Sequence, residues 1–145
     1  MVNSGLMTWQ SWAFLSAVFA ALTAIFAKIG VSDINSDMAT LIRTVIILGV
    51  LALIVLATGQ WQELSGITSR TWLFLTLSAL ATGASWVCYF RALKIGDAAR
   101  VAPIDKLSIV LVAVFGVLVL GERLSATNWL GVGLCTAGIV LVAMR

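Results

Sequence analysis

The chain of 145 residues contains no histidine, two cysteines and one proline. The absence of histidine removes the commonest general base and metal ligand. Cys88 and Cys135 each stand alone within an apolar run, so the sequence indicates neither a metal site nor a disulfide framework. No set of a nucleophile and a base is recognisable either. We therefore expect no catalytic residue, no metal, no cofactor and no enzyme activity.

Charge is also scarce. Charged residues make up 10% of the chain and hydrophobic residues 61%. A soluble domain of this length needs much more polar surface, so we expect the chain to lie in a lipid bilayer. The net charge is +3, but the basic residues lie at the ends of apolar runs rather than on one polar face. This distribution argues against a nucleic-acid partner.

Five apolar segments are long enough to cross the hydrocarbon core of a bilayer, which requires roughly 20 residues. They cover about 9–29, 38–59, 72–93, 101–121 and 127–144. In the last, Ser125 or Thr127 is suited to cap the first free amides of the helix. The sequence therefore predicts an all-α polytopic membrane protein with five transmembrane helices and a single domain over residues 1–145.

The fourth segment carries charge into the membrane. The apolar run from Leu107 to Leu120 is too short to cross by itself. We expect its helix to extend back to about Val101, with Pro103 in the first turn, where a missing N–H is tolerated. This extension places Asp105 and Lys106 below the interface. Because adjacent residues on a helix point in different directions, we expect these two to find partners on other helices.

The basic residues are distributed unevenly between the two sides of the membrane. The side with the N-terminus, the second loop and the fourth loop holds Arg70 and Arg123. With Arg43 and Lys106 set aside as submerged, the other side holds Lys28, Arg91, Lys94, Arg100 and Arg145. The positive-inside rule then predicts a cytoplasmic (inner) membrane protein with its N-terminus outside and its C-terminus in the cytoplasm. It also argues against insertion in both orientations.

Ionisable side chains at membrane depth often mark transport pathways, so Asp105 and Lys106 are the first candidates for a pathway. On this topology Lys28, Arg43 and Arg91 lie at the same cytoplasmic depth. Arg43 and Asp105 could form an ion pair at an inner gate, or the basic cluster could attract an anionic metabolite such as a carboxylate or phosphate. Alternatively, Lys106 snorkels to the headgroups, Asp105 caps a helix, and the others set the topology.

The third segment carries a polar stripe at Ser78, Thr82, Ser85 and Tyr89, spaced along one helical face, with Trp86 beside it. A polar stripe with an aromatic residue suits a wet cavity for small amphipathic molecules. The alternative is that these hydroxyls bond to their own helix and allow close packing.

The fifth segment is rich in small residues, Gly131, Gly133, Ala137 and Gly138. Gly133 and Ala137 form a small-xxx-small pair, which permits close approach of two helix backbones. We expect this face to pack against another helix, within the fold or in a partner.

The order of several short motifs over essentially the whole chain carries a resemblance. They are AIFAKIG, LIRTVI, YFRALKIGDAARVAPIDKLS, VLGERLS and NWLGVGLCTAGIVL. Together they resemble the EamA domain of the drug/metabolite transporter superfamily, in particular its single-domain, five-helix bacterial and archaeal members. The chain departs from the common pattern at Ile109, where many such domains carry a proline.

The resemblance implies a membrane carrier for small organic metabolites that works by alternating access. Larger members contain two such domains of opposite topology, so this chain resembles one half of an inverted-repeat transporter. It is then expected to act as a homo-oligomer or with a partner subunit of opposite topology. Two alternatives stay open, a lipid-linked flippase subunit and a membrane scaffold subunit that does not transport.

Overall fold

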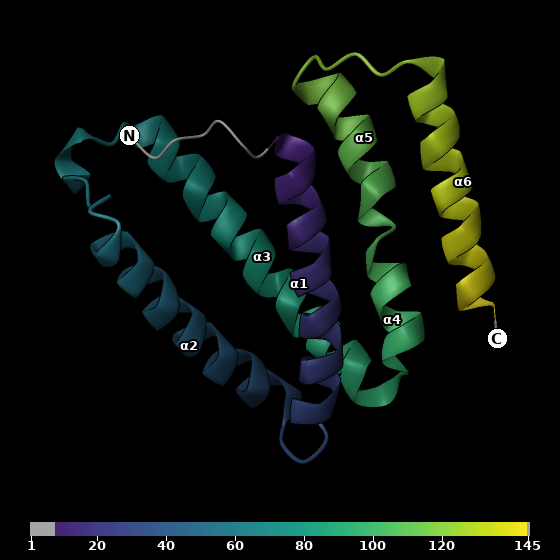
Figure 1. The fold of residues 1–145 in the computed structure, drawn as a ribbon, viewed down its shortest axis with the longest axis horizontal. Helices are drawn as coiled ribbons and strands as arrows, with labels where there is room; N and C mark the ends of the chain where they lie inside the picture. The colour runs from purple at the N-terminus through teal and green to yellow at the C-terminus, as the bar shows by residue number, and fades with distance from the viewer. Residues whose placement is uncertain (1–7, 145) are drawn as a thin grey trace. The chain divides into compact units, whose positions relative to one another are not determined.

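The computed structural model describes residues 8–144 and is all-helical (Figure 1). Its elements are α1 (Trp9–Gly30), α2 (Ser36–Ala57), the short 3₁₀ helix η1 (Leu64–Gly66), α3 (Ser69–Ile95), α4 (Ala98–Asp105), α5 (Ser108–Val119) and α6 (Ala126–Ala143). Arg145, which belongs to the expected cytoplasmic basic set, lies outside the described residues.

Five of the helical stretches are long and apolar enough to cross a membrane, with α4 and α5 together forming the fourth, Ala98–Val119. The prediction of an all-helical protein with five such spans is therefore confirmed. Large apolar side chains are exposed along these helices; Leu80 is 67% exposed and Leu118 is 76% exposed. Such a surface suits contact with lipid or with a partner, because it would be costly in water.

The chain forms two compact units. One covers Lys28–Ile95, and in it α2 packs against α3. Val31 and Leu93 are its fully buried side chains, and Ala39, Thr40 and Phe90 are also buried. The other unit runs to Ala27 and resumes at Gly96. In it, α6 packs against both α4 and α5.

The fourth span is broken between α4 and α5, as Figure 1 shows. The amide of Lys106 donates to Pro103 O at 2.9 Å and the amide of Leu107 donates to Ile104 O at 3.0 Å. These i→i+3 bonds are typical of a tightened 3₁₀ turn. The expectation that Pro103 lies in a first turn is wrong, because α4 begins at Ala98 and Pro103 is inside it. A proline there removes one helical hydrogen bond and crowds the preceding turn, within α4.

Local sequence signals set the ends of two helices. Of the two predicted capping residues, Ser125 caps α6 by accepting a hydrogen bond from the amide of Asn128 at 3.2 Å, and Thr127 lies inside the helix. At the end of α2, Gly59 has a φ of 64°. Its amide donates to Leu56 O at 3.2 Å, and the next amide, of Gln60, donates to Val55 O at 3.1 Å. This turn satisfies the last carbonyls of the helix and favours glycine, which adopts positive φ without strain.

Candidate functional site

A groove of about 630 Å³ lies between α2 and α3. Its walls are mostly apolar, and its polar and aromatic lining consists of Asp37, Thr40, Thr44, Ser78, Thr82 and Trp86. The positions on each helix recur every three or four residues, so each helix contributes one face. The groove thus has the apolar body and the few polar groups that are typical of small-molecule sites.

The predicted stripe on α3 is divided by this groove. Ser78, Thr82 and Trp86 line it, whereas Ser85 and Tyr89 are not among its lining residues. The ring of Tyr89 instead contacts Phe90, with the ring centroids 6.4 Å apart.

The threonine hydroxyls of the groove bond to their own helices. Thr40 donates to Ser36 O at 2.9 Å, Thr44 donates to Thr40 O at 2.8 Å, and Thr82 donates to Ser78 O at 2.9 Å. The alternative interpretation, that the α3 hydroxyls bond to their own helix, thus applies to Thr82, whose hydroxyl donates to Ser78 O. Because each hydroxyl hydrogen is already used, these oxygens can offer only acceptor lone pairs to a molecule in the groove.

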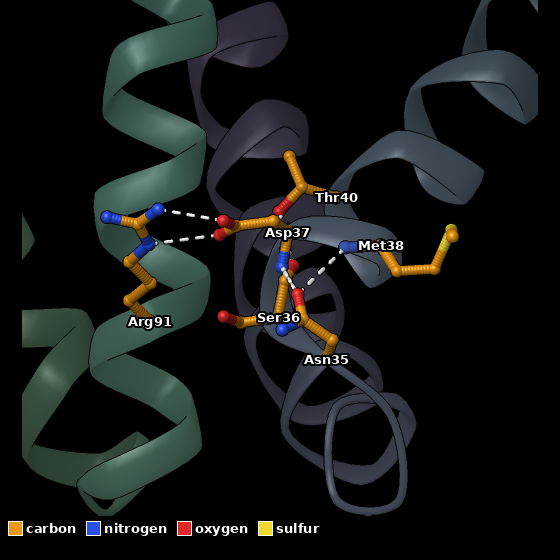
Figure 2. Close-up of polar contacts among 6 residues, drawn as sticks. All are labelled: Asn35, Ser36, Asp37, Met38, Thr40 and Arg91. Atoms are coloured by element: carbon orange, nitrogen blue, oxygen red, sulfur yellow. Dashed lines mark hydrogen bonds and ion pairs between the residues drawn. The ribbon is translucent and has the colours of Figure 1, made fainter.

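An ion pair stands at the end of the groove where α2 begins and α3 ends. Arg91 donates from Nε to Asp37 Oδ1 at 2.9 Å and from Nη2 to Asp37 Oδ2 at 2.7 Å (Figure 2). Asn35 Oδ1 caps α2 by accepting from the amides of Asp37 and Met38. The Arg91 side chain is 61% exposed and that of Asp37 is 49% exposed, so this two-bond pair joins the helices while it stays accessible.

Asp37 is absent from the residues that the sequence singles out. The expected second span begins at residue 38, which leaves Asp37 in the preceding loop. A usable signal exists nonetheless. The start of the second span and the end of the third lie on the same side of the membrane in any five-span topology. An acidic residue in the first position and an arginine in the second are therefore candidates for a pair.

Arg43 lies against α3. Its Cζ atom is 4.3 Å from the centroid of the Trp86 ring and 5.5 Å from that of Phe90. A guanidinium over an aromatic face is held by the ring quadrupole, more strongly where water is excluded. The stack places a positive charge next to Trp86, which lines the groove. Arg43 and Asp105 belong to different compact units, and the gate pair between them stays a prediction.

Two lysines join the end of α3 to the end of α1 and the loop that follows it. Lys28 donates to Leu93 O at 2.7 Å. Lys94 donates to Val31 O at 2.7 Å, Ser32 O at 2.6 Å and Ile34 O at 3.0 Å. Ammonium groups at these positions satisfy carbonyls that no helix partner reaches. This geometry gives Lys28 and Lys94 a structural role. A role of Lys28 in the transport pathway stays a prediction.

Replacing Lys94 by methionine should lower the free energy of unfolding by about 2 kcal/mol, because three carbonyls lose a charged donor. The change preserves the length of the side chain, so packing is little altered. Unfolding by sodium dodecyl sulfate in mixed micelles measures the effect. Lys106→Met is the control, with an expected change within about 0.5 kcal/mol. Equal stability of the Lys94 variant and the parent chain would show that the three contacts contribute nothing.

In the other unit, Asp105 and Lys106 pair with each other. Lys106 Nζ lies 3.0 Å from Asp105 Oδ2, with the side chains 54% and 36% exposed, respectively. The expectation that they do not pair is wrong, because α4 ends at Asp105 and Lys106 already belongs to the turn. The helical separation of neighbouring side chains therefore does not apply to them.

Residues 94–100, which lie between the third and fourth expected spans, are mostly helical. Arg91 and Lys94 lie in the last turns of α3, and Arg100 lies in α4. There Arg100 Nη2 donates to Ala143 O at 3.2 Å, near the end of α6. This contact ties the first turn of α4 to the last turn of α6 within one unit.

The small residues of α6 are open. Gly131, Gly133, Ala137 and Gly138 are all exposed, and a Cβ atom added at any of the three glycines would meet no atom within 4 Å. Thr136, on another face of α6, donates to Val132 O at 2.7 Å. The packing role of the small residues stays a prediction, now directed at a partner.

Five apolar helical spans and a groove between two of them define a polytopic membrane protein. A model of the EamA-like transporter family matches residues 7–144, so the chain belongs to this family of membrane transporters. It is 71% identical over 137 residues to an uncharacterised transporter in the cobO 3′ region of Sinorhizobium sp., covering 94% of this chain and 97% of the relative. No solved structure matches the chain. Family membership implies a small-molecule substrate and a membrane setting.

Proposed function

We propose that the protein is a carrier for small organic metabolites and that the groove between α2 and α3 forms part of the transport path. The observation that supports this most is the position of the groove, along two membrane spans, with apolar walls and hydroxyl acceptors. A carrier needs such a surface because its substrate must leave water without losing all of its hydrogen-bond partners.

The groove requires a second wall. Leu41, Thr44, Ala79, Thr82 and Gly83 line it and are nevertheless exposed. A closed path therefore needs a partner that covers them, either a second copy of this chain or a separate subunit of opposite topology. Alternating access then consists of opening the covered groove to one side of the membrane and later to the other.

The Asp37–Arg91 pair is placed to act as a gate. On the expected orientation, with the N-terminus outside and the C-terminus in the cytoplasm, the pair lies at the cytoplasmic end of the groove. Its two hydrogen bonds join α2 to α3, and both side chains remain accessible to water. Exposed ion pairs open and re-form readily because their net contribution to stability is small. Opening the pair would separate the helix ends beside the groove. Asp105 and Lys106, which lie in the other unit, remain candidates for the transport pathway.

Uptake into proteoliposomes tests the proposed function. Purified protein is reconstituted and given a panel of radiolabelled carboxylates, amines and zwitterions, together with a fluorescent polyprenyl lipid. We expect saturable accumulation of a water-soluble metabolite and no lipid translocation. Lipid translocation without metabolite uptake would support a flippase subunit, and the absence of both would support a scaffold. Either outcome contradicts a metabolite carrier.

A further inference from the structure

We propose a second binding site, for an organic ammonium ion, in the pocket between α5 and α6, with Glu122 as its anionic group. This pocket has a volume of about 390 Å³, and its polar lining is Glu122, Ser108 and Asn128. It belongs to a different compact unit from the α2–α3 groove and uses none of its residues. The proposal therefore goes beyond the proposed function and does not depend on it.

The turn after α5 folds Glu122 back onto that helix. Gly121 has a φ of 70°, and the amide of Glu122 donates to Gly116 O at 3.0 Å. The carboxylate lies over Gly116, where a Cβ atom would come within 2.6 Å of Glu122 Oε2. Gly116 thus provides the room that the carboxylate occupies, and the backbone bond holds the start of the side chain beside it.

The carboxylate of Glu122 is not matched by a cation of the chain. Over residues 8–144 the ion pairs join Arg91 to Asp37 and Lys106 to Asp105. Arg123, the next residue in this turn, makes no ion pair in that part of the protein. The positive φ of Gly121 directs the chain so that Glu122 reaches α5 instead. A negative charge beside an apolar pocket therefore lacks a counterion within the described residues.

The chemistry of the pocket selects the class of ligand. The part of the chain that the structure describes holds no group of three metal-ligating side chains, and a single carboxylate is a poor site for a divalent ion. Apolar walls from Ile109, Val112 and Val132 suit a hydrocarbon body. A monovalent ammonium group on such a body would pair with Glu122 while its apolar part is buried. Burial of the apolar part and the charge-assisted hydrogen bond of the ammonium group would both favour binding.

Equilibrium dialysis with radiolabelled phenethylammonium tests the proposal, with purified protein in detergent. We expect saturable binding of phenethylammonium. Its uncharged analogue 2-phenylethanol should compete at least tenfold less well than unlabelled phenethylammonium does. Glu122→Gln should weaken binding at least tenfold. Gly116→Ala should weaken it comparably although the carboxylate is retained, because the added methyl group displaces it. The atom that must move is the end of a flexible side chain, so α5 itself is not disturbed.

Gly49→Ala is the matched control, since its Cβ atom meets nothing within 4 Å and it lies on α2, outside the pocket. Its binding should equal that of the parent chain. Absence of saturable binding by the parent chain, or equal affinity in the Glu122→Gln variant, would overturn the proposal. A Gly116→Ala variant that binds as well as the parent would also overturn it, because the position of the Glu122 carboxylate over Gly116 would then not matter for binding.

Discussion

Replacing Gly83 by leucine should reduce substrate flux at least tenfold. Gly83 lines the groove between α2 and α3, and a Cβ atom there meets no atom within 4 Å. The backbone can therefore carry a larger side chain without strain, and the leucine would fill part of the groove. Because the glycine is exposed and helical, exchange for leucine should leave the fold stable or strengthen α3. Initial rates of uptake into proteoliposomes measure the effect.

Gly49→Leu provides the control for this prediction. Gly49 lies on α2, is exposed, and also has open space at its Cβ position, but it does not line the groove. We expect its flux to stay within about twofold of the parent chain. Equal flux in both leucine variants would contradict the assignment of the groove to the transport path.

Replacing Asp37 by arginine should abolish most transport, with a loss of at least tenfold. The change places a second cation opposite Arg91, so two hydrogen bonds are replaced by repulsion between like charges. The helix ends then cannot close as they do in the present structure. Exchanging both charges, Asp37→Arg with Arg91→Asp, should restore flux to within about threefold of the parent chain. Uptake rates at matched protein density distinguish the three chains.

Asp33→Arg is the charge-matched control. Asp33 is exposed in the loop before α2, and its Oδ2 accepts from Ser32 at 3.1 Å rather than from an arginine. It changes the net charge of the same region by the same amount and should leave flux within about twofold. A double exchange as inactive as Asp37→Arg would show that the pair does not act as a gate.

The number of spans and the cap at Ser125 could be predicted from the sequence, because they depend on local properties. A run of apolar residues long enough to cross the bilayer has few alternatives in lipid, since every backbone group must bond within its own helix. Likewise, Ser125 and the amide of Asn128 are three residues apart, so the sequence alone brings them together.

The break in the fourth span and the contacts of the charged residues could not be predicted in the same way. The position of Pro103 within α4 depends on where the helix starts, and α4 begins at Ala98, before the expected start at about Val101. The three carbonyls that Lys94 reaches lie in the loop between α1 and α2, 60 to 63 residues earlier in the chain. Such contacts depend on how helices pack, and periodicity along one helix contains no information on them.

Labelling of a single cysteine in the groove tests the central proposal most directly. Cys88 and Cys135 are both exposed, so they are first replaced by serine. Ala79→Cys then places a thiol in the groove, and Gly49→Cys places one on α2 outside it. With a membrane-impermeant maleimide, we expect the thiol at position 79 to react and to be protected by substrate, while that at position 49 stays unlabelled. Equal failure of both positions to react would contradict a water-accessible path between α2 and α3.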